Sequence, residues 1–139
     1  MKIKTLLCLM IICFNITYGQ NLIDSNSTTK NNESTFENLS IEEFNKKVNN
    51  KNKLVLVNFS ADWCIVCKKQ KPILDEMKVE KKNILEIMYL NMEKNPLIAE
   101  YFEVDGLPVN LLYDKGKIIW SREGIVSKIE MLELLKNNK

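Results

Sequence analysis

Cys64 and Cys67 stand two residues apart in the stretch FSADWCIVCKK, which spans residues 59–69. Such a CxxC pair can close a structural disulfide, supply part of a metal site, or act as a redox dithiol. The thiolate is the reactive form of cysteine, and the free amides and dipole of a helix N-terminus stabilise that anion. Lys68 and Lys69 follow within one turn and add positive potential. If Cys64 begins a helix, we expect it to be the reactive thiol, with Lys68 tuning its thiolate.

The spacing places Cys67 one helical turn after Cys64, where it can attack a mixed disulfide formed at Cys64. This favours a redox-active Cys64–Cys67 disulfide over an inert one, because closing a four-residue loop gains little stability. A closed zinc site needs four ligands, and the chain has no histidine. We expect no metal and no cofactor, although a two-coordinate copper(I) site stays open. The lack of histidine also rules out Cys–His dyads and Ser–His–Asp triads.

The elements that must hold these cysteines follow from apolar periodicity and turn signals. These signals predict the order α-β-α-β-α-β-β-α within a domain at residues 39–139. The expected elements are a helix after Ser40, a strand at 54–61, a helix at 64–79, a strand at 84–92, a helix at 96–102, strands at 109–113 and 117–121, and a helix after Ser127.

This order implies an α/β fold, with a central mixed sheet flanked by helices on both faces. The strand at 54–61 runs straight into the helix that holds the cysteines. The pair therefore sits at the carboxyl end of a strand and the N-terminus of a helix, where α/β folds commonly place chemistry. In the last helix we expect Ile129, Leu132 and either Leu134 or Leu135 to face the core.

The N-terminus has the layout of a secretory signal peptide, predicted over residues 1–19. Lys2 and Lys4 make a basic start, residues 6–16 form an apolar run, and small residues precede the expected cleavage point. The apolar run is too short for a comfortable membrane span, although an uncleaved membrane anchor is the alternative. We therefore expect an exported protein in the periplasm or another extracytoplasmic place. Residues 20–38, rich in Asn, Ser and Thr, predict a flexible tether.

Removal of this leader changes the composition of the chain. The whole sequence has 20 basic and 18 acidic residues, and the leader holds two lysines and no acid. The mature net charge is therefore near zero, which gives no sign of a nucleic-acid partner. Two of the four cysteines, Cys8 and Cys13, also lie in the leader. The domain must then depend on its apolar core rather than on a disulfide framework.

These motifs resemble the thioredoxin family over about residues 39–137. The family pattern W-C-x-x-C-K stands here as Trp63, Cys64, Cys67 and Lys68, and the segment VDGLP ends at Pro108. The resemblance implies a thioredoxin-like fold in which Pro108 is a cis-proline beside the CxxC pair.

In that fold the backbone of Leu107 would pair with an extended substrate segment. Trp63, Leu107 and Pro108 would then form the docking groove. For Trp63, capping the core is an equal alternative. The string ADWCIVCK looks most like the periplasmic C-terminal domains of transmembrane thiol–disulfide reductases.

The chain departs from the family in two places. Asn58 stands six residues before Cys64, where thioredoxins usually have an aspartate that carries a proton for Cys67. Asparagine cannot titrate, so either water or another acid, such as Asp62 or Glu93, takes that role, or deprotonation of Cys67 is slower. The pair Ile65–Val66 replaces the usual Gly-Pro and offers no hydrogen-bond donor to the thiolate. A less stabilised thiolate makes the dithiol a better reductant.

The sequence thus predicts an exported, monomeric thiol–disulfide oxidoreductase that reduces or exchanges protein disulfides. An unidentified thiol donor upstream would supply its electrons. One alternative is a redox-inactive binding or assembly module that uses the apolar surface of Ile65 and Val66. A copper(I) carrier is the less favoured alternative.

Overall fold

A computed structural model describes residues 36–138 of the chain. The predicted signal peptide and the tether up to residue 35 lie outside the described residues. Within residues 36–138, every helix is too short or too polar to cross a membrane. The order of elements predicted from the sequence is confirmed. The elements are α2 (Ile41–Val48), β1 (Leu54–Ser60), α3 (Ile65–Glu80), β2 (Leu85–Asn91), α4 (Pro96–Tyr101), β3 (Val109–Asp114), β4 (Lys117–Glu123) and α5 (Lys128–Asn137).

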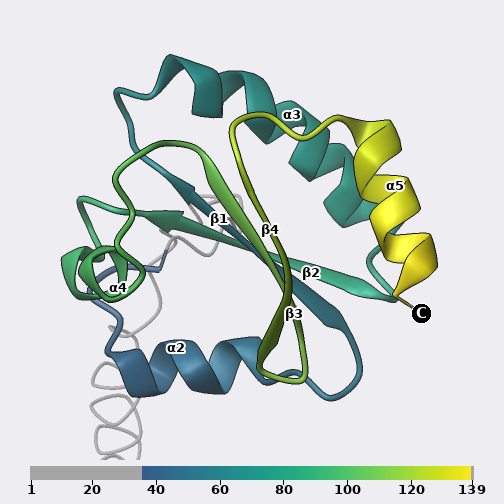
Figure 1. Cartoon of the computed structure of the whole chain (residues 1–139), viewed down its shortest axis with the longest axis horizontal. Helices are drawn as coiled ribbons and strands as arrows, with labels where there is room; N and C mark the ends of the chain where they lie inside the picture. The colour runs from purple at the N-terminus through teal and green to yellow at the C-terminus, as the bar shows by residue number, and fades with distance from the viewer. Residues whose placement is uncertain (1–35, 139) are drawn as a thin grey trace, which may run out of the picture. The chain divides into compact units, whose positions relative to one another are not determined.

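The four strands form one mixed sheet in the order β2-β1-β3-β4 (Figure 1). β1 pairs in parallel with β2 and antiparallel with β3, and β4 closes an antiparallel hairpin with β3. The hairpin turns at Lys115 and Gly116, which both have positive φ, as a tight two-residue turn requires. In this register Asn58 lies between Tyr89 of β2 and Asn110 of β3.

Helices cover both faces of the sheet, as the sequence predicted: α2 and α4 lie on one side, and α3 and α5 on the other (Figure 1). Side chains alternate along a strand, so each face of β1 contributes to a different core. Val55, Val57 and Phe59 pack in one cluster with residues of α2 and α4. Leu54 and Leu56 pack in the other with residues of α3 and α5.

The inward face of α5 differs from the prediction. Ile129, expected in the core, is 71% exposed, whereas Met131 and Leu135 are buried. Met131 and Leu135 are four residues apart and share the helix face that packs in the core, whereas Ile129, two residues before Met131, lies on the opposite side of the helix. Leu132 and Leu134 pack against the edge of the same cluster and are partly buried.

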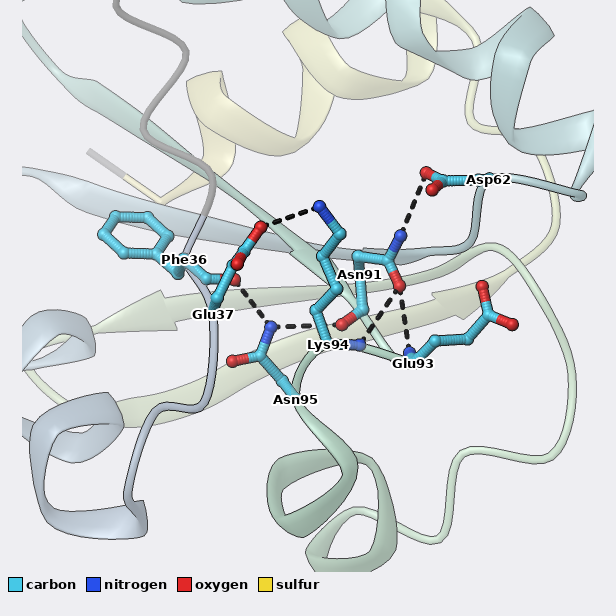
Figure 2. A network of polar contacts seen from close by, with 7 residues as sticks. All are labelled: Phe36, Glu37, Asp62, Asn91, Glu93, Lys94 and Asn95. Carbon is cyan, nitrogen blue, oxygen red and sulfur yellow. Dashed lines mark hydrogen bonds and ion pairs between the residues drawn. The ribbon is translucent and has the colours of Figure 1, made fainter.

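The first described residues lie along β2 and the turn that follows it (Figure 2). Phe36 forms a parallel bridge with Leu90, and the N–H of Asn38 donates to the carbonyl of Lys94 at 2.7 Å. Asn95 holds this segment, because its Nδ2 donates to the carbonyl of Phe36 at 2.7 Å. The same turn carries residues that reach the candidate site.

Candidate active site

Cys64 and Cys67 form a disulfide, with their Cα atoms 5.3 Å apart. Cys64 is the N-cap of α3, and its Sγ accepts a hydrogen bond from the backbone N–H of Cys67 at 3.1 Å. A cap side chain normally carries an oxygen in this role, and here sulfur takes it. The helix dipole and this N–H favour negative charge on Cys64 Sγ once the disulfide is opened.

The disulfide is buried, whereas the apolar side chains next to it in the sequence are exposed. Cys64 and Cys67 are 4% and 6% exposed, whereas Trp63 and Ile65 are 64% and 69% exposed. Val66 is also exposed. Trp63 therefore does not cap the core, and its side chain is available at the surface next to Cys64.

The loop before β3 comes to the same place from the other half of the chain. The Leu107–Pro108 peptide bond is cis, as the resemblance implied, and Pro108 is buried. Leu107 is partly buried and packs against the cluster formed by Ala61, Cys64 and Cys67. The antiparallel pairing of β3 with β1 brings this loop to the end of β1 that leads into the cysteines.

Asn58 is buried on β1 and pairs with a residue that the sequence analysis missed. Its Nδ2 donates to Oδ1 of Asn110, on β3, at 2.9 Å. Nδ2 of Asn110 in turn donates to the carbonyl of Gly124 at 3.1 Å. Asn110 is the polar residue of the apolar strand VNLLY, which could have marked it in the sequence. Its pairing with Asn58 could not be predicted, because it depends on which strand lies beside it.

A pocket of about 460 Å³ opens beside Cys67. Among the described residues, its lining includes one carboxylate, three lysines and several neutral polar groups. The lining residues are Asn58, Ser60, Ala61, Asp62, Cys67, Lys68, Lys71, Tyr89, Asn91 and Lys94.

Two of these lysines have carboxylate partners of their own. Lys71 contacts Asp75 at 2.9 Å, and Lys94 contacts Glu37 at 2.7 Å. Burial favours a higher pKa for Asp75, but hydrogen bonds from Tyr89 and Lys71 outweigh it and lower that pKa. The hydrogen bond with Glu37 raises the pKa of Lys94, so this cation stays charged at neutral pH.

Asn91 and Asp62, which both line this pocket, are joined by a hydrogen bond (Figure 2). Nδ2 of Asn91 donates to Oδ1 of Asp62 at 3.0 Å. Oδ1 of Asn91 accepts from the backbone N–H of Glu93 at 2.9 Å, which sets the orientation of the amide. The side chain of Glu93 makes none of the contacts drawn in Figure 2 and does not line the pocket.

The comparisons with known proteins agree with this geometry. The thioredoxin family model matches residues 35–137. The thioredoxin of Buchnera aphidicola subsp. Schizaphis graminum is 35% identical over 100 residues, which cover 72% of this chain and 93% of that protein. The thioredoxin of Acidithiobacillus ferridurans is 33% identical over 97 residues, covering 70% and 90%. Thioredoxin Y2, chloroplastic, of Arabidopsis thaliana is 33% identical over 96 residues, covering 68% and 57%.

The Cys64–Cys67 pair stands at the N-terminus of α3, the Leu107–Pro108 bond is cis, and the family model matches nearly all of the described domain. These findings agree on one family and one activity. The chain belongs to the thioredoxin family and is a thiol–disulfide oxidoreductase.

Proposed function

We propose that this protein is an exported reductase of protein disulfides, with Cys64 as the attacking thiol and Cys67 as the resolving thiol. The observation that carries the assignment is the hydrogen bond from the N–H of Cys67 to Sγ of Cys64 at the start of α3. It distinguishes the two cysteines, which are otherwise buried to a similar extent. In the reduced protein this bond and the helix dipole stabilise the thiolate at Cys64 rather than at Cys67.

The reaction takes two exchange steps. The thiolate of Cys64 attacks one sulfur of a substrate disulfide, which forms a mixed disulfide and releases the first substrate thiolate. Cys67 then loses its proton and attacks Sγ of Cys64, which releases the second substrate thiolate. The substrate disulfide gains two electrons, and the Cys64–Cys67 dithiol is oxidised to the disulfide.

Trp63, Leu107 and Pro108 form the docking surface in this proposal. Trp63 offers a large exposed ring next to Cys64, and Leu107 packs against the cysteine cluster from the opposite loop. An extended substrate segment would pair with the backbone of Leu107, as in strand addition. Lys68, which follows Cys67 and lines the adjacent pocket, adds positive potential to the site.

The reductive direction rests on the residues between the cysteines. The side chains of Ile65 and Val66 are exposed and carry no polar hydrogen, so they donate no hydrogen bond to the thiolate. We expect a reduction potential more negative than about −260 mV, below the range measured for glutathione pools by extraction. A potential near those of glutathione or the strong oxidants would overturn the reductive assignment.

Export rests on the leader at residues 1–19, and it implies a thiol donor outside the cytoplasm. Fusion of the leader to a reporter that folds only after secretion, compared with the same fusion lacking residues 1–19, tests this part. Retention of the full fusion in the cytoplasm would contradict it.

Insulin reduction tests the activity itself. Wild type should turn over, Cys64→Ser should lose turnover, and Cys67→Ser should accumulate mixed disulfides with its protein substrates. Val79→Ala, an exposed change near the far end of α3, is the matched control and should keep full activity. A folded wild-type protein that reduces no disulfide would favour the binding-module alternative, and tight stoichiometric copper(I) binding by that protein would favour the carrier.

A further inference from the structure

The second step of the proposed reaction needs an acceptor for the proton of Cys67. The thiol is a weak nucleophile, and Cys67 must ionise before it attacks the mixed disulfide. Asn58 lines the same pocket as Cys67 but has no proton to exchange. This inference rests on the proposed function, because it concerns the resolving step of that reaction.

The contacts of Asn58 show that this residue does not supply the missing proton acceptor. The carbonyl of Gly124 accepts from Nδ2 of Asn110, so Oδ1 of Asn110 is the atom that faces Asn58. Oδ1 of Asn110 then accepts from Nδ2 of Asn58. The Asn58 amide is thus held by Asn110, and an amide cannot take up the proton of Cys67 at neutral pH.

The pocket supplies one group that can take the proton. Titratable side chains reach it from α3, from β2 and from the turn after β2. Lysine and tyrosine side chains hold their protons at neutral pH and cannot accept another. Among the described residues that line the pocket, Asp62 is the single carboxylate. The titratable groups that share the pocket with it are Cys67, Lys68, Lys71, Tyr89 and Lys94.

We propose that Asp62 is the proton acceptor for Cys67, through water in this pocket. The proton leaves Cys67 Sγ, passes along the water and arrives at the carboxylate of Asp62, and the Cys67 thiolate then attacks Sγ of Cys64. When the disulfide is reduced again, Asp62 returns the proton by the same route. Asn91 is a positioning residue, because its Nδ2 holds the Asp62 carboxylate at 3.0 Å.

The symmetrical disulfide of thionitrobenzoate separates the two steps, because each step releases one coloured thiolate. Attack by Cys64 gives a first release that depends on reagent concentration. Resolution by Cys67 gives a second, first-order release. Because thionitrobenzoate is a good leaving group, we expect ionisation of Cys67 to limit the rate of this second release. Rapid mixing of equimolar reagent with reduced protein records both phases.

Asp62→Asn keeps the Oδ1 that accepts from Asn91 but removes the carboxylate, so the local contacts survive. Its second phase should slow about tenfold or more, while the first phase is unchanged. The rate of this second phase should also rise more steeply with pH in Asp62→Asn than in wild type, because solvent then accepts the proton of Cys67. Asp62→Glu should restore most of the rate. Glu93→Gln removes an equal charge from the neighbouring turn, outside the pocket lining, and should leave both phases unchanged.

Equal second-phase rates in Asp62→Asn and Glu93→Gln would overturn the proposal, whether both are normal or both are slow. Slowing of both phases in Asp62→Asn would overturn it too, because the effect would not be specific to Cys67. Failure of the proposed function looks different. In that case wild type would reduce no insulin or would release no second thiolate, and the Asp62 variants would behave in the same way.

Discussion

Asn58 and Asn110 are cross-strand partners in the β1–β3 ladder, and Nδ2 of Asn58 donates to Oδ1 of Asn110 at 2.9 Å. Both side chains are buried, and neither can change its charge. Asn58 stands where thioredoxins usually have the aspartate that exchanges protons. The backbone carbonyl of Gly124 fixes the direction of the whole chain of amides. A titratable residue at position 58 would therefore need a different partner at position 110.

Asn58→Asp should destabilise the protein at neutral pH. The new carboxylate would face Oδ1 of Asn110 with no proton to donate, and it would be charged and buried. We expect a loss of about 2–4 kcal/mol in the free energy of unfolding. Burial should raise the pKa of the introduced carboxyl, so the loss is largest above that pKa and shrinks as pH falls and the carboxyl is protonated.

Urea denaturation at neutral and acid pH measures both effects. Asn45→Asp is the control, because Asn45 is exposed on α2 and should change stability little. An Asn58→Asp variant as stable as wild type at neutral pH would contradict the assigned direction of the amide pair.

The position of the cysteines was predictable, whereas the polar groups around them were not. LVLVNFSA is rich in β-branched residues and leads directly into a helical pattern, so local signals alone place Cys64 at a helix N-terminus. Asn110 is a single polar residue in an apolar strand, and its partner depends on the strand order and register. Ile129 fits a helical stripe in the sequence, but α5 buries the face that carries Met131 and Leu135 and leaves Ile129 exposed.

Gln70→Ala should lower stability although the substitution changes no charge. Nε2 of Gln70 donates to the carbonyl of Val126 at 3.2 Å, and its Oε1 accepts from the N–H of Val126 at 2.6 Å. Both residues are buried, so truncation leaves two backbone groups unsatisfied. We expect a loss of about 2–4 kcal/mol in the free energy of unfolding.

Urea denaturation of Gln70→Ala beside Lys69→Ala tests this clamp between α3 and the segment before α5. Lys69 is exposed and adjacent, so its truncation should cost little. Similar midpoints for the two variants would show that water replaces the side chain of Gln70.

Trp63→Ala should weaken substrate docking without loss of folding. The side chain of Trp63 is 64% exposed beside Cys64, so it gives little to the core, and in the proposed function it contacts the substrate. Truncation of an aromatic contact residue at an interface costs about 1–2 kcal/mol, which corresponds to a roughly tenfold fall in kcat/KM. Insulin-reduction kinetics should place most of this change in KM. A normal KM would remove Trp63 from the docking surface.

Tyr113→Phe should leave the protein as stable as wild type, or more stable by up to about 2 kcal/mol. Within residues 36–138, the hydroxyl of Tyr113 is buried without a hydrogen-bond partner. Its ring packs edge-on against Phe44, with centroids 6.0 Å apart, and phenylalanine keeps that contact. Burial of the hydroxyl therefore removes its hydrogen bonds to water, and no hydrogen bond in the folded protein replaces them.

The same burial predicts a difference at alkaline pH. Burial raises the pKa of Tyr113 from its ordinary value of 10.0, with a smaller contribution from Tyr101. The folded protein then keeps the phenol proton in a range where the unfolded chain has lost it, so wild-type stability falls as pH rises above 10. Tyr113→Phe should escape this part of the alkaline loss, whereas the exposed Tyr101→Phe should not. Parallel alkaline unfolding curves for wild type and Tyr113→Phe would mean that the hydroxyl of Tyr113 reaches solvent in the native protein.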